Sequence, residues 1–192
     1  GATTEFVGFE RLSATATVTE VVEEKKRTGI VLDRSPFYAE MGGQVGDTGT
    51  LSIGGKTWAV TGTQKAGDAF LHFIKGDGVP EVGGEAELAV DAARRAAIQR
   101  HHTVTHLFHW ALHEVTSPDA SQKGSYVGPE KLTFDFNSPP LTPQQVADIE
   151  QLVNERIVDN AVVSWTGMPY SEVAGNDGIL QFFGDKYGDT VR

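Results

Sequence analysis

The chain has 192 residues, of which 39% are apolar, enough for the core of one large domain or two small ones. Its formal net charge of −10 argues against a broad basic surface that grips DNA or RNA without specificity. The absence of cysteine excludes disulfides and thiolate sites within the chain and fits a cytoplasmic protein. This net charge does not exclude a local basic patch built from residues 24–27, Arg94, Arg95, Arg100 and Lys123. No apolar run reaches the roughly 20 residues needed to cross a bilayer.

Residues 1–90 are predicted to form β structure. Short stretches rich in β-branched and aromatic residues alternate with glycine clusters that are typical of tight turns. The expected strands are Ser13–Glu23, Gly29–Asp33, Gly49–Ile53, Thr57–Gly62, Phe70–Ile74 and Glu85–Val90. Several short strands at this spacing predict a small, glycine-rich, barrel-like domain over residues 1–90, with a strongly bent sheet as the alternative.

Near residue 90 the spacing of apolar residues changes from a strand pattern to a helix pattern. Asp91 is a candidate N-cap for a helix that runs to about Val115, and Thr142, with Pro143 in the first turn, caps a second helix. Strands are expected at Lys131–Phe136 and Ala161–Trp165, and a short helix at Pro169–Val173. The predicted class is therefore α+β, with a two-layer α+β domain over residues 91–192 after the barrel.

Five of the six histidines fall between residues 101 and 113. His102, His106, His109 and His113 follow the spacing i, i+4, i+7, i+11, which places four imidazoles on one helix face. The i, i+4 pairs can share a metal ion, but two ligands hold Zn²⁺ weakly because a closed site takes four. Ordinary hydrogen-bonded or solvated histidines explain the stripe equally well.

Two polar motifs lie outside this helix. In the glycine-rich segment 35–49, Gly42 and Gly43 permit positive φ, and Gln44 could present its amide to a ligand. In residues 121–125, Lys123 with flanking hydroxyls could bind a phosphate or carboxylate. Local pattern alone favours a hairpin without a ligand for the first motif and a plain polar loop for the second. No pair of carboxylates stands out as a general acid and base.

Five stretches, taken in order, resemble the editing domain of alanyl-tRNA synthetase over nearly the whole chain. They read FYAEMGGQVGD, HTVTHL, SQKGS, FDF and FGDKY and begin at Phe37, His102, Ser121, Phe134 and Phe183. Free-standing editing proteins share the Gly-Gly-Gln and His-x-x-x-His elements. The resemblance implies the editing-domain fold of the threonyl- and alanyl-tRNA synthetase type for the second domain.

The resemblance also implies a zinc site. His102 and His106 correspond to the two histidine ligands of the family, whereas His109 and His113 line the same helix face and His101 is not a ligand. The family completes the site with a Cys-Gly-Gly-Thr-His motif, which we expect beyond Arg192. The chain is therefore expected to be a piece of a longer protein, with a weak or empty Zn²⁺ site by itself.

The implied activity is hydrolysis of the ester in mischarged tRNA(Ala), chiefly Ser-tRNA(Ala), with Gly-tRNA(Ala) as a further candidate. Gln44 is the predicted catalytic-site residue, and Met41, Gly42, Gly43 and Lys123 are the predicted substrate-binding residues. Met41 stands where the family often has serine. The expected partners are the aminoacylated tRNA 3′ end and the rest of the synthetase chain, with no membrane. The alternatives are a non-catalytic tRNA-binding or structural module and a free-standing trans-editing hydrolase.

Overall fold

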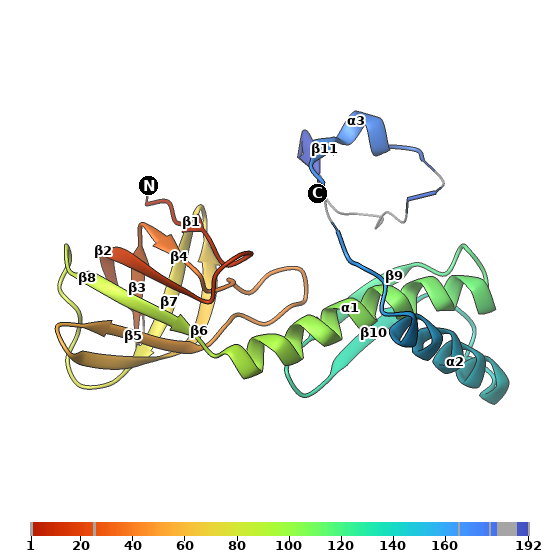
Figure 1. Ribbon diagram of the computed structural model, residues 1–192, viewed down its shortest axis with the longest axis horizontal. Coiled ribbons are helices and arrows are strands. Elements are labelled where there is room, and N and C mark those ends of the chain that lie inside the picture. The colour runs from red at the N-terminus through yellow and green to blue at the C-terminus, as the bar shows by residue number, and fades with distance from the viewer. Residues whose placement is uncertain (1, 25, 165, 177, 180–187, 192) are drawn as a thin grey trace. The chain divides into compact units, whose positions relative to one another are not determined.

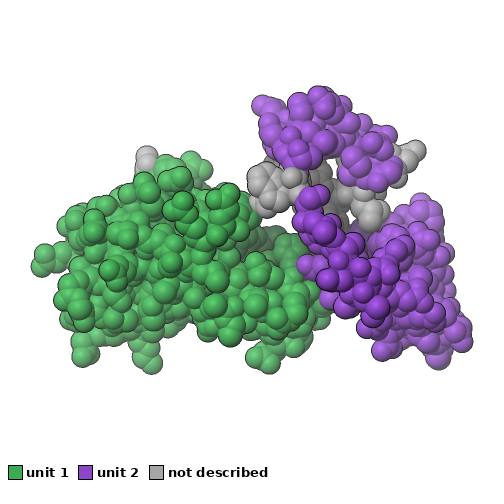
Figure 2. All heavy atoms as spheres, in the orientation of Figure 1, with its two compact units in different colours: residues 1–102, 125–133 green, residues 103–124, 134–192 purple. Residues whose placement is uncertain are grey.

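The computed structural model describes residues 2–24, 26–164, 166–176, 178–179 and 188–191. The chain divides into two compact units, coloured separately in Figure 2. Unit 1 comprises residues 1–102 and 125–133, and unit 2 comprises residues 103–124 and 134–192. This division passes through helix α1 (Ala92–Val115), so the domain boundary near residue 90 stays a prediction.

Unit 1 contains a closed, six-stranded antiparallel barrel, seen in Figure 1. The strands follow the order β2-β3-β7-β6-β5-β8 around the barrel. Their bounds are Ser13–Glu24 for β2, Arg27–Leu32 for β3, Ala69–Lys75 for β7, Lys56–Ala66 for β6, Gly49–Ile53 for β5 and Glu85–Val90 for β8. Each strand expected before residue 90 overlaps one of these, and the barrel is confirmed.

The barrel interior is filled by alternate residues of its strands. In β8, Ala86, Leu88 and Val90 are buried, while the alternate residues Glu85, Glu87 and Ala89 are exposed. Phe37, from the segment after the short strand β4 (Arg34–Ser35), adds a fully buried ring to this core. Strand β4 pairs in parallel with β1 (Glu5–Phe6). Burial of a side chain the size of phenylalanine contributes about 1.5–3 kcal/mol, so this aromatic ring ties the segment firmly to the barrel.

Helix α1 begins where the last barrel strand ends. The backbone N–H of Arg94 donates to Oδ1 of Asp91 at 3.0 Å, as expected for an N-cap aspartate. The helix ends at Val115, the predicted residue. Both ends of α1 could therefore be predicted from local capping and periodicity.

Unit 2 is built around a second helix, α2 (Pro143–Asp159). Thr142 Oγ1 accepts from the N–H of Gln145 at 3.2 Å, and Oε1 of Gln145 accepts from the N–H of Thr142 at 2.9 Å, which forms the capping box. The core contains the buried residues Ala111, Leu112, Ala120 and Ile149, with the rings of Phe108, Phe134 and Phe136 packed against it. Strands β9 (Gln122–Val127) and β10 (Leu132–Phe136), which the division between the units crosses, form a two-stranded sheet. The mixed α+β class is confirmed.

The predicted strand Ala161–Trp165 is wrong for residues 161–164. These residues form no regular structure, and the side chains of Val162 and Val163 are 94% and 85% exposed. A β-branched run needs a partner strand and a buried face, and here it has neither. Trp165 lies outside the described residues.

Among the described residues, the last part of the chain holds three short elements. Helix α3 covers Tyr170–Val173, close to the expected helix, while β11 (Met168–Pro169) pairs with β12 (Thr190–Val191). The stretch Phe183–Tyr187, used for the resemblance, lies outside the described residues. Within the described ranges, no helix has the length and apolar character required to span a membrane.

Candidate functional site

The Gly-Gly-Gln motif forms a tight turn in unit 1. Met41 and Gln44 exchange backbone hydrogen bonds of 3.2 and 3.0 Å across the two glycines. Gly42 and Gly43 have φ values of 61° and 83°, the left-handed pair that a type I′ turn requires. The positive φ expected for both glycines is therefore observed.

This turn lies against the strand segment that follows the Ser-Gln-Lys-Gly motif. The N–H of Val127 donates to the carbonyl of Gly43 at 2.8 Å, and the N–H of Val45 donates to the carbonyl of Val127 at 3.0 Å. A Cβ atom at Gly43 would lie 2.5 Å from the carbonyl oxygen of Ser125, closer than packing allows. Gly43 and the segment 125–127, about eighty residues apart in the chain, thus meet within one compact unit.

Substituting Gly43 with alanine should destabilise unit 1 more than the same change at Gly42. Both substitutions place a side chain in the left-handed region, which costs about 1–2 kcal/mol of stability for each residue. The methyl group of Gly43→Ala would in addition clash with the backbone of Ser125. A Cβ at Gly42 has no atom within 4 Å and makes no such clash. Urea unfolding of the two variants measures the difference directly. Equal free energies of unfolding would show that contact with Ser125 does not restrain the turn.

Gln44 contacts the first histidine of the His-x-x-x-His motif. Its side chain is only 7% exposed, and its Oε1 lies 2.6 Å from Nδ1 of His102. An amide oxygen can only accept, so Nδ1 of His102 carries the proton in this arrangement. The neighbouring His101 uses its own Nδ1 on the carbonyl of Gly128, also at 2.6 Å. Partial burial lowers the pKa of His102, which favours the neutral imidazole that binds metals.

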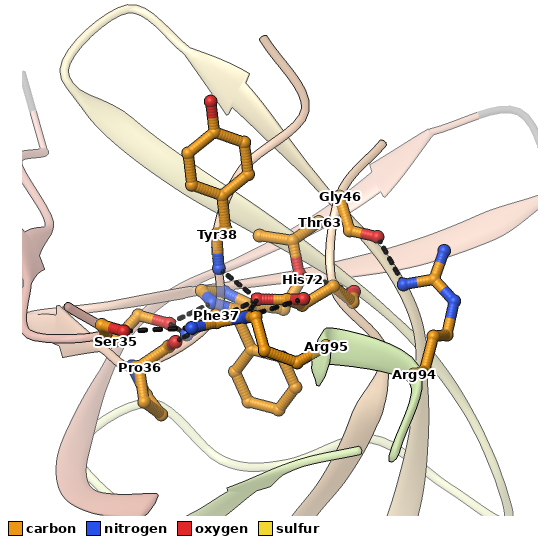
Figure 3. A network of polar contacts seen from close by, with 11 residues as sticks. Ser35, Pro36, Phe37, Tyr38, Gly46, Thr63, His72, Arg94 and Arg95 are labelled. Carbon is orange, nitrogen blue, oxygen red and sulfur yellow. Dashed lines mark hydrogen bonds and ion pairs between the residues drawn. The ribbon is translucent and has the colours of Figure 1, made fainter. Parts of the chain in front are cut away.

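A buried ion pair joins the same loop to helix α1, and its Arg95 is labelled in the network of Figure 3. Nε of Arg95 lies 3.1 and 2.9 Å from the two carboxylate oxygens of Asp47, and Nη2 of Arg95 also donates to Asp47 Oδ2. Nη1 and Nη2 of Arg95 also donate to the carbonyls of Gly8 and Pro36 at 2.9 and 2.8 Å. The surface patch proposed for Arg95 is therefore wrong, since its side chain is buried and neutralised.

Asp47 also organises the backbone around it. Its Oδ2 accepts from the N–H of Tyr38 at 2.7 Å, and its carbonyl accepts from Thr63 Oγ1 at 3.1 Å. Burial, and secondarily the charge of Asp47, raise the pKa of the Tyr38 phenol. Nη1 of Arg94 donates to the carbonyl of Gly46 at 2.9 Å. Gly46 and Asp47 are thus held in place between the barrel and the start of α1.

Ser35 and His72 form a pair whose atom types suggest a nucleophile and its base. Ser35 Oγ lies 2.7 Å from Nε2 of His72, whose Nδ1 lies 2.9 Å from the carbonyl of Ile30. Both side chains are fully buried, and the N–H of Phe37 donates to Ser35 Oγ at 3.1 Å. Burial lowers the pKa of His72 to about 4. No substrate can reach this hydroxyl, so the pair is a structural element of the barrel, and sequence reasoning did not find it.

The two predicted metal ligands lie on helix α1. His102, which is partly buried against Gln44, and His106 lie one turn apart on α1. Among the residues that the structure describes, no group of three or more His, Asp or Glu side chains is arranged to hold a metal ion. Two imidazoles fit half of a tetrahedral zinc site and do not close it.

The other predicted residues differ in their surroundings. His109 is 4% exposed and packs in unit 2 against the rings of His113 and Phe134, whereas Nε2 of His113 lies 2.5 Å from the carbonyl of Ala120. Met41 is 39% exposed, beside the glycine turn in unit 1. Lys123 is exposed and belongs to unit 2, so it is not brought together with Gly42 and Gly43 in one unit.

Comparison with known proteins places these features in context. Residues 2–94 match the family model "tRNA synthetases class II (A)". Three curated relatives are named alanine–tRNA ligase: those of Akkermansia muciniphila, Methylacidiphilum infernorum and Opitutus terrae, 47%, 46% and 41% identical over 193, 192 and 198 residues. The alignments cover 100%, 99% and 98% of this chain but 20%, 20% and 21% of the relatives, so the chain spans about a fifth of their length. The chain is thus similar, from end to end, to one segment of alanine–tRNA ligases, and its first half matches the class II synthetase model.

Proposed function

We propose that this chain is the segment of an alanine–tRNA ligase that hydrolyses mischarged tRNA(Ala). Its chief substrate is Ser-tRNA(Ala), and Gly-tRNA(Ala) is a further candidate. The observation that carries the proposal is the 2.6 Å contact between Gln44 and His102. This contact unites the two motifs shared with editing proteins, and Gly43 packs against Ser125 of the third motif beside it. The 47% identity to an alanine–tRNA ligase supports the same assignment.

A second site is chemically necessary for accurate alanine selection. One pocket separates substrates that differ by a methylene or a hydroxyl by only about 1–3 kcal/mol. An editing site that hydrogen-bonds the serine hydroxyl leaves its own polar groups unpaired when alanine enters, and thereby rejects alanine. Gln44 is our candidate for that contact. Because its Oε1 faces His102, its amide N–H groups are the ones suited to donate to the substrate.

Zinc is the proposed cofactor. His102 and His106 would hold it, and the remaining ligands would come from outside the described residues. Bound zinc would act as a Lewis acid near the aminoacyl ester. The chain's own part is to orient the His102 imidazole through Gln44 and to keep the glycine turn fixed.

The tRNA partner is proposed to bind by its aminoacylated 3′ end. With a net charge of −10, the chain is expected to bind phosphate through a few local cations instead of a broad basic face. Lys123 is exposed and has serines at positions 121 and 125, so it is a candidate contact to phosphate. Burial of Arg95 removes that residue from the set of candidates. The rest of the synthetase chain would supply aminoacylation.

Gln44→Ala in an alanine–tRNA ligase carrying this segment should lower kcat/KM for hydrolysis of Ser-tRNA(Ala) by about 10- to 100-fold. Aminoacylation with alanine should persist, because that activity would belong to another part of the enzyme. The matched control is Gln151→Ala, an exposed glutamine on α2 whose side chain bonds only to Glu155 among the described residues. Unchanged hydrolysis in Gln44→Ala would remove Gln44 from the site. Absence of serine-specific hydrolysis in the parent enzyme would favour a non-catalytic module.

A further inference from the structure

We propose that Gln44 is a positioning residue that fixes the tautomer of His102. With Nδ1 protonated and bound to Gln44, the lone pair of the neutral ring lies on Nε2. His102 would then bind a metal ion through Nε2. The use of this tautomer for zinc rests on the proposed function, whereas the tautomer itself follows from the contact alone.

The chemistry of the two side chains determines the direction of the hydrogen bond. Oε1 of Gln44 has lone pairs and no proton, and it lies 2.6 Å from Nδ1 of His102. A neutral imidazole has one donor and one acceptor nitrogen, so a donor at Nδ1 makes Nε2 the acceptor. Metal-bound histidines almost always donate their other N–H to an oxygen acceptor in this way, which orients the ring and raises its basicity.

The amide oxygen can have this effect only because the residue that carries it is held in place. The Gly42-Gly43 turn closes onto Gln44 through the backbone bonds to Met41. On either side of Gln44, Gly43 and Val45 are hydrogen-bonded to Val127. Gln44 itself is 7% exposed, so little space is left for its side chain to rotate.

Helix α1 contacts the same loop at a second point, Arg95, which lies seven residues before His102. Arg95, Ile98 and His102 follow the spacing i, i+3, i+7, which places them on one face of α1. Arg95 holds Asp47 and Ile98 is fully buried, while His102 meets Gln44. Loop residues 44 and 47 therefore contact the helix two turns apart. This double attachment keeps the acceptor aligned with the imidazole even before any metal binds.

Nitrogen-15 NMR of the 192-residue chain at alkaline pH tests the tautomer. In the unsubstituted chain, His102 should show a protonated Nδ1 and an unprotonated Nε2. Gln44→Met removes the oxygen acceptor at similar length and should shift His102 toward the Nε2–H form. Gln44→Glu restores an oxygen acceptor and should restore the Nδ1–H form. His101, whose Nδ1 faces the carbonyl of Gly128, is the internal control and should stay unchanged in both variants.

Each outcome decides the proposal. A His102 ring that is Nε2–H in the unsubstituted chain, or that stays Nδ1–H in Gln44→Met while His101 is unchanged, would overturn it. If Gln44→Met unfolds the chain, the Gln44→Glu spectrum still decides: loss of the Nδ1–H form despite a retained acceptor contradicts the proposal, and its persistence supports it. A residue with a merely structural role would alter stability and leave the tautomer unaffected.

The link to zinc has its own readout. In a ligase that carries this segment, Gln44→Met should weaken zinc binding by about 10- to 100-fold, and Gln44→Glu should not. Equal zinc affinity in all three proteins would contradict the positioning role at the metal. Failure of the proposed editing function would appear differently, as absence of Ser-tRNA(Ala) hydrolysis with the His102 tautomer still set by Gln44.

Discussion

Replacing Arg95 with methionine is expected to lower the free energy of unfolding by about 3–5 kcal/mol. The reason lies with its partner: the side chain of the loop residue Asp47 is 1% exposed and would remain buried without its counter-charge. The carbonyls of Gly8 and Pro36 would lose donors at the same time. Urea or thermal unfolding monitored by circular dichroism measures the change.

Two further variants separate the ion pair from general disruption. Arg94→Met removes one hydrogen bond to the carbonyl of Gly46 and should lower stability by about 1 kcal/mol. Combining Arg95→Met with Asp47→Asn removes both charges while position 47 can still accept from the N–H of Tyr38. The double variant should therefore be less destabilised than the sum of the two single variants. Additive losses, or an Arg95→Met loss no larger than that of Arg94→Met, would show that the pair does not anchor the loop.

Much of the fold could be predicted because its signals are local. Asp91 and Thr142 mark helix starts through their own side-chain hydrogen bonds to nearby backbone, and both helices begin where these caps predict. Strands such as Glu85–Val90 show their buried face as simple alternation. Residues 161–164 have the same composition but pair with no strand among the described residues, and composition does not reveal whether a partner exists.

The site was harder to predict because its contacts are distant in the chain. Gln44 and His102 are 58 residues apart, and the sequence shows each motif but not their hydrogen bond. Arg95 was assigned to a surface patch because basic residues are usually exposed. The spacing of Arg95 from Ile98 and His102 places all three on one helix face. This spacing could have predicted that Arg95 is buried. His72 gave no signal, because a single histidine in a β-strand reveals neither its burial nor its partner Ser35.

The stability of the chain is expected to fall by about 3 kcal/mol between pH 6.5 and pH 4 through His72 alone. Burial lowers the pKa of this histidine from 6.5 to about 4 in the folded state. In that window the unfolded chain binds a proton that the folded chain does not, so unfolding is favoured as the pH falls. Above pH 6.5 the ring is neutral in both states and the contribution is fully present. Below pH 4 both states are protonated and no further loss arises from this residue.

His72→Gln isolates this effect, because glutamine offers both a donor and an acceptor to Ile30 and Ser35 but does not titrate. The variant should be less stable than the parent at pH 7.5, since an amide does not reproduce the 2.7 and 2.9 Å contacts of the imidazole. Its stability should nevertheless decline less steeply toward pH 4, so that the two curves converge. Carboxylates and the other histidines titrate in both proteins, and the difference between the curves therefore reports on position 72. Parallel curves would mean that His72 is protonated without loss of its two contacts, and that the barrel interior tolerates the charge.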